Sequence, residues 1–221
     1  MTALSKGHDL GKVTLYGHQD SGHSYKVALA LTILNTPFNY RPIDPLSSRD
    51  LRPKIWKDAS RFGEIPVLLW RNEALVQSNA ILLRLARENE TLGWDISPNQ
   101  LIEWLFWESN RIGFSLPNLR YTIKCPNMLP TADQNWLRVR LENDLNYLED
   151  ALSNAPFLMG QSVSAADVAC CSYLYYSDHL GIDIMNWPSV EQWLRRIQAL
   201  PRWQHPYDMM SLRCCESPNV C

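Results

Sequence analysis

The kinds of hydrophobic pattern in this 221-residue chain differ before and after about residue 91. Before that point short β-rich runs alternate with helical stretches, and beyond residue 99 only helical patterns remain. Strands repeat every two residues and helices about every 3.6, so a segment with one period is a poor candidate for the other element. We therefore expect an α/β domain over residues 1–90, a linker with Gly and Pro over 91–98, and an all-helical domain over 99–221.

The first ninety residues predict the element order βαβαββα. The two-residue turn "RN" separates the last two strands, which are therefore expected to form an antiparallel hairpin. The last helix of this domain is expected to be capped by Ser78. Strands are predicted at 12–17, 37–43, 65–70 and 73–77, with helices at 22–35, 47–58 and 78–90; the second domain should have helices at 99–116, 131–152, 164–179 and 189–199.

One helix start in the second domain is closely specified by the stretch "QSVSAADVACC". Ser164 is the expected N-cap and Asp167 follows three residues later, as in a capping box. Val163 and Val168 occupy the hydrophobic-staple positions. Such a cap contributes about 1 kcal/mol, and we expect its role to be structural.

Composition and charge exclude several classes of function. The formal net charge of −2 and the absence of a basic stripe disfavour nucleic-acid binding. No apolar run approaches the roughly 18 residues of a membrane span, and the first residues do not resemble a signal peptide, so a cytoplasmic protein is expected. The six cysteines form no C-x-x-C pair and no metal-ligand spacing with the five histidines, which indicates reduced thiols and no metal.

Three segments of the first domain carry residues suited to binding an anion. The turn "DSGHSYK" places Ser21, His23 and Ser24 between a strand and an apolar helix, where backbone N–H groups are unpaired. Ordinary helix capping is the alternative reading of these serines. Pro66 at a strand start predicts a cis bond after Ile65. The dipeptide "QS" at 77–78 opens a helix whose N–H groups suit a carboxylate.

These segments resemble the cytosolic glutathione transferases over about residues 12–210. "IPVL" followed by "QSNAILLRLA", together with the "SVSAAD" cap, is similar to that family's pattern. "SGHSYKVAL" and "IEWLFWES" resemble a bacterial branch near the serine- or threonine-type zeta, theta and nu classes. The resemblance implies a thioredoxin-like N-terminal domain followed by the all-helical domain.

The resemblance also implies roles for individual residues. Ser21 would donate its hydroxyl to the glutathione sulfur, with His23 as the rival donor and Ser24 a third catalytic candidate. The other implied glutathione ligands are Ile65 and Pro66 for the cysteinyl part, Gln77 and Ser78 for the γ-glutamyl part, and Arg61, Lys54 or Lys57 for the glycyl carboxylate. Relatives often read "NPxGxVP" where this chain reads "SRFGEIP", so Arg61 is either a ligand or a surface residue.

The electrophile pocket is expected to involve the helix at 99–116. Its candidate residues are Trp107, Arg111, Phe114 and Tyr121. The aromatic side chains have an alternative role in core or dimer packing. Arg111 is expected to pair with Glu108 or Glu103, or to face an anionic substrate.

The resulting functional expectation is an enzyme that activates the thiolate of glutathione for attack on small electrophiles, in detoxification. The cytoplasmic protein would be a homodimer without metal, nucleic-acid or membrane partners. Three alternatives remain open: glutathione-dependent disulfide or peroxide reduction, ether cleavage or dehalogenation in aromatic catabolism, and a non-enzymatic binding module of the same fold.

Overall fold

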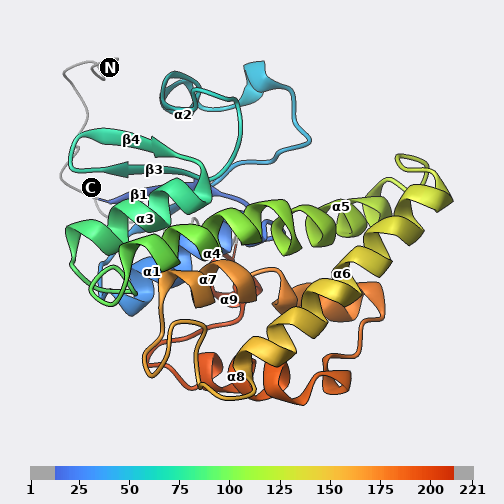
Figure 1. Cartoon of the computed structure of the whole chain (residues 1–221). Helices are drawn as coiled ribbons and strands as arrows, with labels where there is room; N and C mark the ends of the chain where they lie inside the picture. Colours follow the sequence, from blue (N-terminus) through green and yellow to red (C-terminus); the bar gives the residue numbers. More distant parts are fainter. Residues whose placement is uncertain (1–12, 212–221) are drawn as a thin grey trace. The chain divides into compact units, whose positions relative to one another are not determined.

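The computed structural model describes residues 13–211 (Figure 1). The first twelve residues, on which the cytoplasmic expectation partly depends, lie outside these described residues. So do three of the six cysteines: Cys214, Cys215 and Cys221. The first elements are β1 Thr14–Gly17, α1 Gly22–Ile33, β2 Asn39–Pro42, the 3₁₀ turn η1 Arg49–Leu51, α2 Lys54–Ala59, β3 Val67–Trp70, β4 Glu73–Val76 and α3 Ser78–Glu88. The remaining elements are α4 Pro98–Asn110, α5 Ile112–Lys124, α6 Thr131–Leu152, α7 Ala165–Cys171, η2 Leu174–Leu180, η3 Ile184–Asn186, α8 Pro188–Gln198 and α9 Pro206–Met209.

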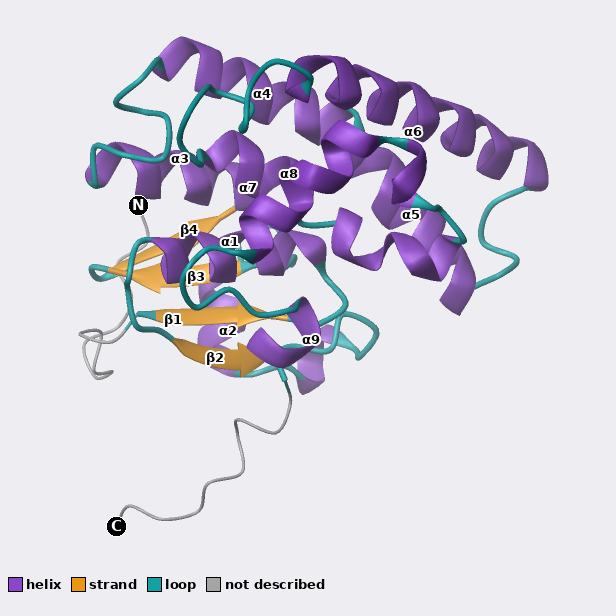
Figure 2. Cartoon of the chain, turned by 90° about the horizontal axis from the view of Figure 1, so that it is seen from below, coloured by secondary structure: helices purple, strands orange, loops and turns teal. Residues whose placement is uncertain are grey.

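The four strands form one mixed sheet in the order β2-β1-β3-β4 (Figure 2). β1 pairs in parallel with β2, and antiparallel with β3, which pairs antiparallel with β4. Arg71 and Asn72 join β3 to β4 with φ angles of 48° and 64°. Two consecutive positive φ angles are the signature of a two-residue hairpin turn whose twist matches that of the strands. The predicted element order and hairpin are confirmed.

Two local expectations in the first domain need correction. The helix predicted at 47–58 is divided into η1 and α2, and Pro53 at the N-cap of α2 marks the division. The last helix begins at Ser78 itself, because the carbonyl of Gln77 already accepts a hydrogen bond from the N–H of Ile81 at 2.9 Å. Gln77 therefore occupies the N-cap position that we expected Ser78 to hold.

Two predicted helices of the second domain are interrupted. The segment 99–116 divides at Arg111, whose φ of −109° and ψ of −102° lie outside helical values. Gly113 follows this break, where a Cβ atom would collide with the carboxylate of Glu108. The helix predicted at 164–179 ends at Cys171 and continues as the 3₁₀ segment η2. α6 has the predicted bounds, with Leu residues buried at 137, 141, 145, 148 and 152.

The predicted capping box is present at the start of α7. The Ser164 hydroxyl oxygen accepts from the N–H of Asp167 at 3.3 Å, and the Asp167 carboxylate accepts from the N–H of Ser164 at 2.8 Å. The same buried carboxylate accepts from the N–H of Leu158 and from Nε1 of Trp193, both at 2.8 Å. The cap thus also joins α7 to α8 and to the loop before it.

The described residues form two compact units. One contains the residues up to Leu82 together with those from Gln204 onward, and the other is Leu83–Trp203. This division falls within α3, so the boundaries 1–90, 91–98 and 99–221 stay a prediction. None of the helices between residues 13 and 211 combines the length and apolar composition that a membrane span requires.

Candidate functional site

The hydroxyl of Ser21 lies at the N-terminus of α1 as its cap. Ser21 has extended backbone angles, φ −100° and ψ 107°, and its Oγ accepts from the N–H of Ser24 at 3.2 Å. Helix capping was the alternative reading of the serines in this turn, and the structure gives the N-cap position to Ser21. A serine hydroxyl that accepts through its oxygen still has a proton to donate. Ser21 therefore has the chemistry required to donate to an anion bound at the helix start.

Ser24 lies inside α1 and is fully buried. Its Oγ accepts from the N–H of His18 at 3.2 Å, and it is packed against Gly17, where an added Cβ would meet the Ser24 side chain at 2.7 Å. Glycine at position 17 is thus required by this close approach. These contacts give Ser24 a structural role in holding the turn between β1 and α1, and its catalytic role stays a prediction.

His23 connects the start of α1 to the start of α3. Its Nδ1 lies 3.4 Å from the Oγ of Ser78, which is itself buried. Burial, with a smaller contribution from the charge of Lys26, lowers the pKa of His23 from 6.5 to about 3. Lys26 donates from Nζ to Oδ1 of Asn79 at 3.1 Å, a second connection between the two helix starts. His23 is consequently a neutral imidazole at physiological pH.

Gln77 connects the start of α3 to the segment before β3. Its backbone has a φ of 68°, and its Nε2 donates to Oε2 of Glu64 at 2.8 Å. Glu64 precedes the Ile65–Pro66 peptide bond, which is cis as predicted. Polar contacts therefore link the three segments that the sequence singled out. Each of them belongs to the first compact unit.

The basic residues before Pro66 are engaged near their own positions. Lys54 forms an ion pair with Asp58 one helical turn later, at 2.6 Å, with 84% of its side chain exposed. Lys57 donates from Nζ to the carbonyl of Asp50 at 3.2 Å. The guanidinium of Arg61 lies 4.8 Å from the ring centroid of the neighbouring Phe62. Binding of a glycyl carboxylate by Lys54 or Arg61 stays a prediction.

Comparison with known proteins identifies the family. The family model described as "Glutathione S-transferase, N-terminal domain" matches residues 11–87, and "Glutathione S-transferase, C-terminal domain" matches 127–205. The chain is a member of the cytosolic glutathione transferase superfamily. The thioredoxin-like domain and the helical domain that the sequence predicted are those of this family.

Individual proteins of known sequence or structure align with this superfamily member over most of its length. The disulfide-bond oxidoreductase YfcG of Escherichia coli K12 is 27% identical, with 81% of this chain and 87% of the relative covered. The crystal structure of a glutathione S-transferase from Pseudomonas fluorescens Pf-5 is 29% identical with a TM-score of 0.76, covering 88% of this chain and 98% of that one. A glutathione S-transferase from Xanthobacter autotrophicus Py2 has the same TM-score at 26% identity, with 89% and 98% covered.

Arg111, a predicted pocket residue of this transferase-family chain, forms an ion pair with Asp144. Its Nε donates to Oδ1 of Asp144 at 2.6 Å, and the Asp144 side chain is fully buried. The expected pairing with Glu108 or Glu103 is corrected by this contact across to α6. Burial raises the pKa of Asp144, and the hydrogen bond and charge of Arg111 act against that rise. The ion pair of Arg111 therefore connects the junction of α4 and α5 to α6.

The three aromatic pocket candidates make separate contacts in this family member. Trp107 packs with Tyr147, their ring centroids 5.3 Å apart. Phe114 meets Trp136 edge-on at 6.4 Å. Tyr121 lies beside Cys125, and a hydrogen bond between their side chains raises the pKa of Tyr121. The structure does not bring these three rings into one cluster, so their role at an electrophile stays a prediction.

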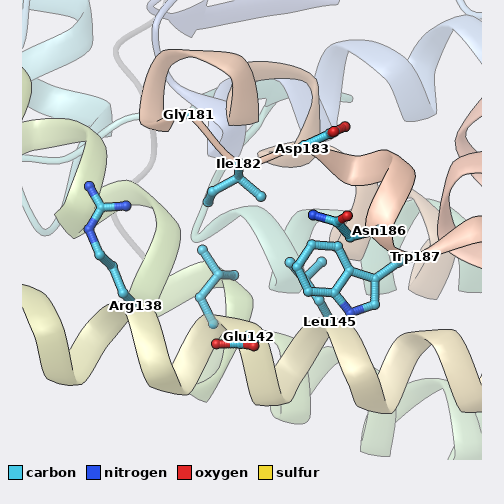
Figure 3. Close-up of a pocket in the computed structure, with 9 residues that line it drawn as sticks. Arg138, Glu142, Leu145, Gly181, Ile182, Asp183, Asn186 and Trp187 are labelled. Carbon is cyan, nitrogen blue, oxygen red and sulfur yellow. The ribbon is translucent and has the colours of Figure 1, made fainter.

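A groove of about 220 Å³ in the helical unit contains none of the predicted site residues (Figure 3). Arg138, Glu142 and Leu145 of α6 line one side, and Ile182 and Asp183 lie opposite. Over residues 13–211 no group of three or more His, Cys, Asp or Glu side chains is arranged to hold a metal ion.

Sequence reasoning missed Glu64, His18, Asp20 and Tyr207 around the site of this transferase-family chain. Glu64 holds the side chain of Gln77, and Asp20 accepts a hydrogen bond from Tyr207. His18 and Asp20 lie on the same short turn as Ser21, so their nearness to the site was a local signal in the sequence. Tyr207 gave no such signal, because 187 positions separate it from its partner.

Proposed function

We propose that this chain binds glutathione at the first unit and transfers it to small electrophiles, with Ser21 stabilising the thiolate. The observation that carries the proposal is the Ser21 hydroxyl at the N-cap of α1, in the same unit as the linked starts of α3 and the cis Ile65–Pro66 segment. Family membership supports a glutathione-dependent activity in general. Detoxification and a cytoplasmic location complete the proposal.

The chemistry follows from thiol ionisation. A free thiol has a pKa of about 8.5, so only a few per cent is thiolate near neutral pH. Lowering that pKa by about two units requires about 2.7 kcal/mol. A hydrogen bond to a charged group contributes about 1.5–3 kcal/mol and a helix N-terminus about 0.3–1 kcal/mol, so the two together are sufficient. The thiolate then forms a sulfur–carbon bond while the leaving group departs with its bonding electrons.

Other residues receive roles in the same proposal. Gln77 and Ser78 would hold the γ-glutamyl amino and carboxylate groups, and Ile65 would pair through its backbone with the cysteinyl part. The glycyl carboxylate would reach Arg61 or Lys54. The electrophile would contact the helical domain, where the candidates are Trp107, Arg111, Phe114 and Tyr121.

Disulfide reduction is a second candidate, favoured by the similarity to the disulfide-bond oxidoreductase YfcG. Because the turn has Ser21 and no cysteine, the attacking sulfur would be that of glutathione. The thiolate would attack a disulfide, form a new mixed disulfide and release the other sulfur as a thiolate, so the electrons balance. Assays with a halo-nitroaromatic, a hydroperoxide, an aryl ether and a mixed disulfide distinguish the reactions. Calorimetry showing no glutathione binding would favour a non-enzymatic module instead.

Replacing Ser21 with Ala tests the proposed thiolate donor. We expect a higher pKa of bound glutathione and a fall of about tenfold or more in turnover near neutral pH, since one charge-assisted donor is lost. The defect should shrink at alkaline pH, where the thiol ionises without help. Thiolate absorbance titrated in the glutathione complex measures the pKa directly.

Two further variants separate the donor from its rivals. Ser21→Thr keeps both the cap and the hydroxyl and should retain most of the thiolate, whereas Ser21→Ala also loses a cap. His23→Ala should have a much smaller effect on the thiol pKa, because a neutral imidazole adds no positive charge. A wild-type thiol pKa in Ser21→Ala, with a shifted one in His23→Ala, would assign the role to His23.

We also propose that the chain forms a homodimer through the helical unit. Five large hydrophobic side chains on α4, α5 and α6 are exposed: Phe106 (74%), Phe114 (45%), Trp136 (55%), Val139 (59%) and Tyr147 (54%). Exposed aromatic and aliphatic side chains of this number favour an interface that covers them. Sedimentation at micromolar concentration should show about twice the single-chain mass of 25.5 kDa. A species at the single-chain mass alone would contradict the dimer.

A further inference from the structure

Residues 204–211 pack in the first unit, although they follow the whole helical unit in sequence. The hydroxyl of Tyr25 on α1 donates to the carbonyl of Gln204 at 2.8 Å. Pro206 and Met210 are buried, and Thr32 on α1 lies 3.9 Å from the sulfur of Met209. α9 is therefore anchored on α1 at both of its ends. A side chain between these anchors is held in a defined place.

Tyr207 lies between the anchors and reaches the turn that carries Ser21. Its hydroxyl donates to Oδ1 of Asp20 at 2.7 Å. The N–H of Asp20 donates to Nδ1 of His18 at 3.2 Å, and the N–H of Ser21 donates to the carbonyl of His18 at 2.9 Å. The Asp20 carboxylate is thus held between Tyr207 and a closed turn from His18 to Ser21.

The position of the Asp20 carboxylate affects the stability of an anion bound at Ser21, because the carboxylate is itself negatively charged. A carboxylate close to a thiolate disfavours ionisation of the thiol, because like charges repel. A hydrogen bond from a phenol stabilises the carboxylate where it is and prevents it from rotating toward the neighbouring residue. Nδ1 of His18 lies 3.7 Å from Oδ2 of Asp20, so the imidazole faces the same carboxylate from within the turn.

We propose that Tyr207 is a positioning residue that keeps the Asp20 carboxylate directed at α9 and the turn around Ser21 in a thiolate-stabilising geometry. The proposal rests on the proposed function of Ser21 and adds a dependence on a segment near the end of the chain. Tyr207 acts through Asp20 and does not itself touch glutathione.

The test uses the full chain and the pKa of the bound glutathione thiol. Tyr207→Phe keeps the ring and removes the donor, so we expect the thiol pKa to rise by about half a unit to one unit. Turnover near neutral pH should fall by about three- to tenfold and recover at alkaline pH, while glutathione affinity changes little. Two histidines face this pair and are left intact in the variant: Nδ1 of His18 lies 3.7 Å from Oδ2 of Asp20, and the ring centroid of His205 lies 5.5 Å from that of Tyr207.

A double-mutant cycle shows whether the effect passes through Asp20. In an Asp20→Asn background the carboxylate charge is absent, so adding Tyr207→Phe should produce little further rise in the thiol pKa. Tyr175→Phe removes a tyrosine hydroxyl that donates to the carbonyl of Leu194 in the helical unit at 3.4 Å. It is the matched control and should leave the titration unchanged.

The outcomes separate this proposal from the function on which it rests. A wild-type thiol pKa in Tyr207→Phe, with a raised one in Ser21→Ala, overturns the role of Tyr207 and leaves the proposed function in place. An equal rise from Tyr207→Phe in the Asp20→Asn background overturns the route through Asp20. Absence of glutathione binding to the wild-type chain overturns the proposed function itself.

Discussion

Replacing Asp167 with Ala is expected to lower the free energy of unfolding by about 3–5 kcal/mol, because each buried donor left unpaired costs about 1–3 kcal/mol. The carboxylate accepts from the N–H groups of Leu158 and Ser164 and from Nε1 of Trp193, and all of these bonds are 2.8 Å long. It also accepts from the Ser164 hydroxyl at 2.6 Å. Asp167 and Trp193 are fully buried, so water cannot replace the lost acceptor.

Urea denaturation followed by tryptophan fluorescence and circular dichroism measures this loss. Asp178→Ala is a suitable control, since that carboxylate is 81% exposed and lies in the same unit. The control should change stability by less than about 0.5 kcal/mol. Ser164→Ala should remove the cap and one of the hydrogen bonds to Asp167, at a cost of about 1–2 kcal/mol. If Asp167→Ala were no more costly than Ser164→Ala, the carboxylate would be only a helix cap and not the centre of a network.

Replacing Ser78 with Ala is expected to weaken glutathione binding by about 1–3 kcal/mol, as for a lost hydrogen bond to a charged group. Ser78 is the first residue of α3, where N–H groups and the helix dipole favour a carboxylate. Its hydroxyl lies 3.4 Å from Nδ1 of His23, so the loss also leaves the imidazole with one contact fewer. Isothermal titration calorimetry with glutathione gives the change in dissociation constant.

The control for Ser78 is a serine of the same unit outside the site. Ser48 is exposed and makes no side-chain cap bond at the start of η1, so Ser48→Ala should bind glutathione as the wild type does. A stability measurement on Ser78→Ala separates weaker binding from loss of fold. An unchanged dissociation constant in a folded Ser78→Ala variant would remove α3 from the glutathione site.

Much of the fold was predictable because its determinants are close together in sequence. The hairpin between β3 and β4 depends on Arg71 and Asn72, and the capping box depends on Ser164 and Asp167, three positions apart. The cis peptide bond before Pro66 and the bounds of α6 were likewise predictable from short stretches. The candidate site was predictable only as three separate segments.

By itself, the sequence determined the order of elements, the family and the capping box at Ser164, because hydrophobic period, turns and short cap motifs are local properties of the chain. Only the tertiary structure decided which side chains meet. Arg111 at the helix break pairs with a buried Asp144 that lies 33 positions away, and the contact of His23 with Ser78 spans 55 positions. The contact of Tyr207 with Asp20 spans 187. Such pairs form when packing places two distant segments side by side. A local sequence pattern does not identify the distant residue that a side chain will contact.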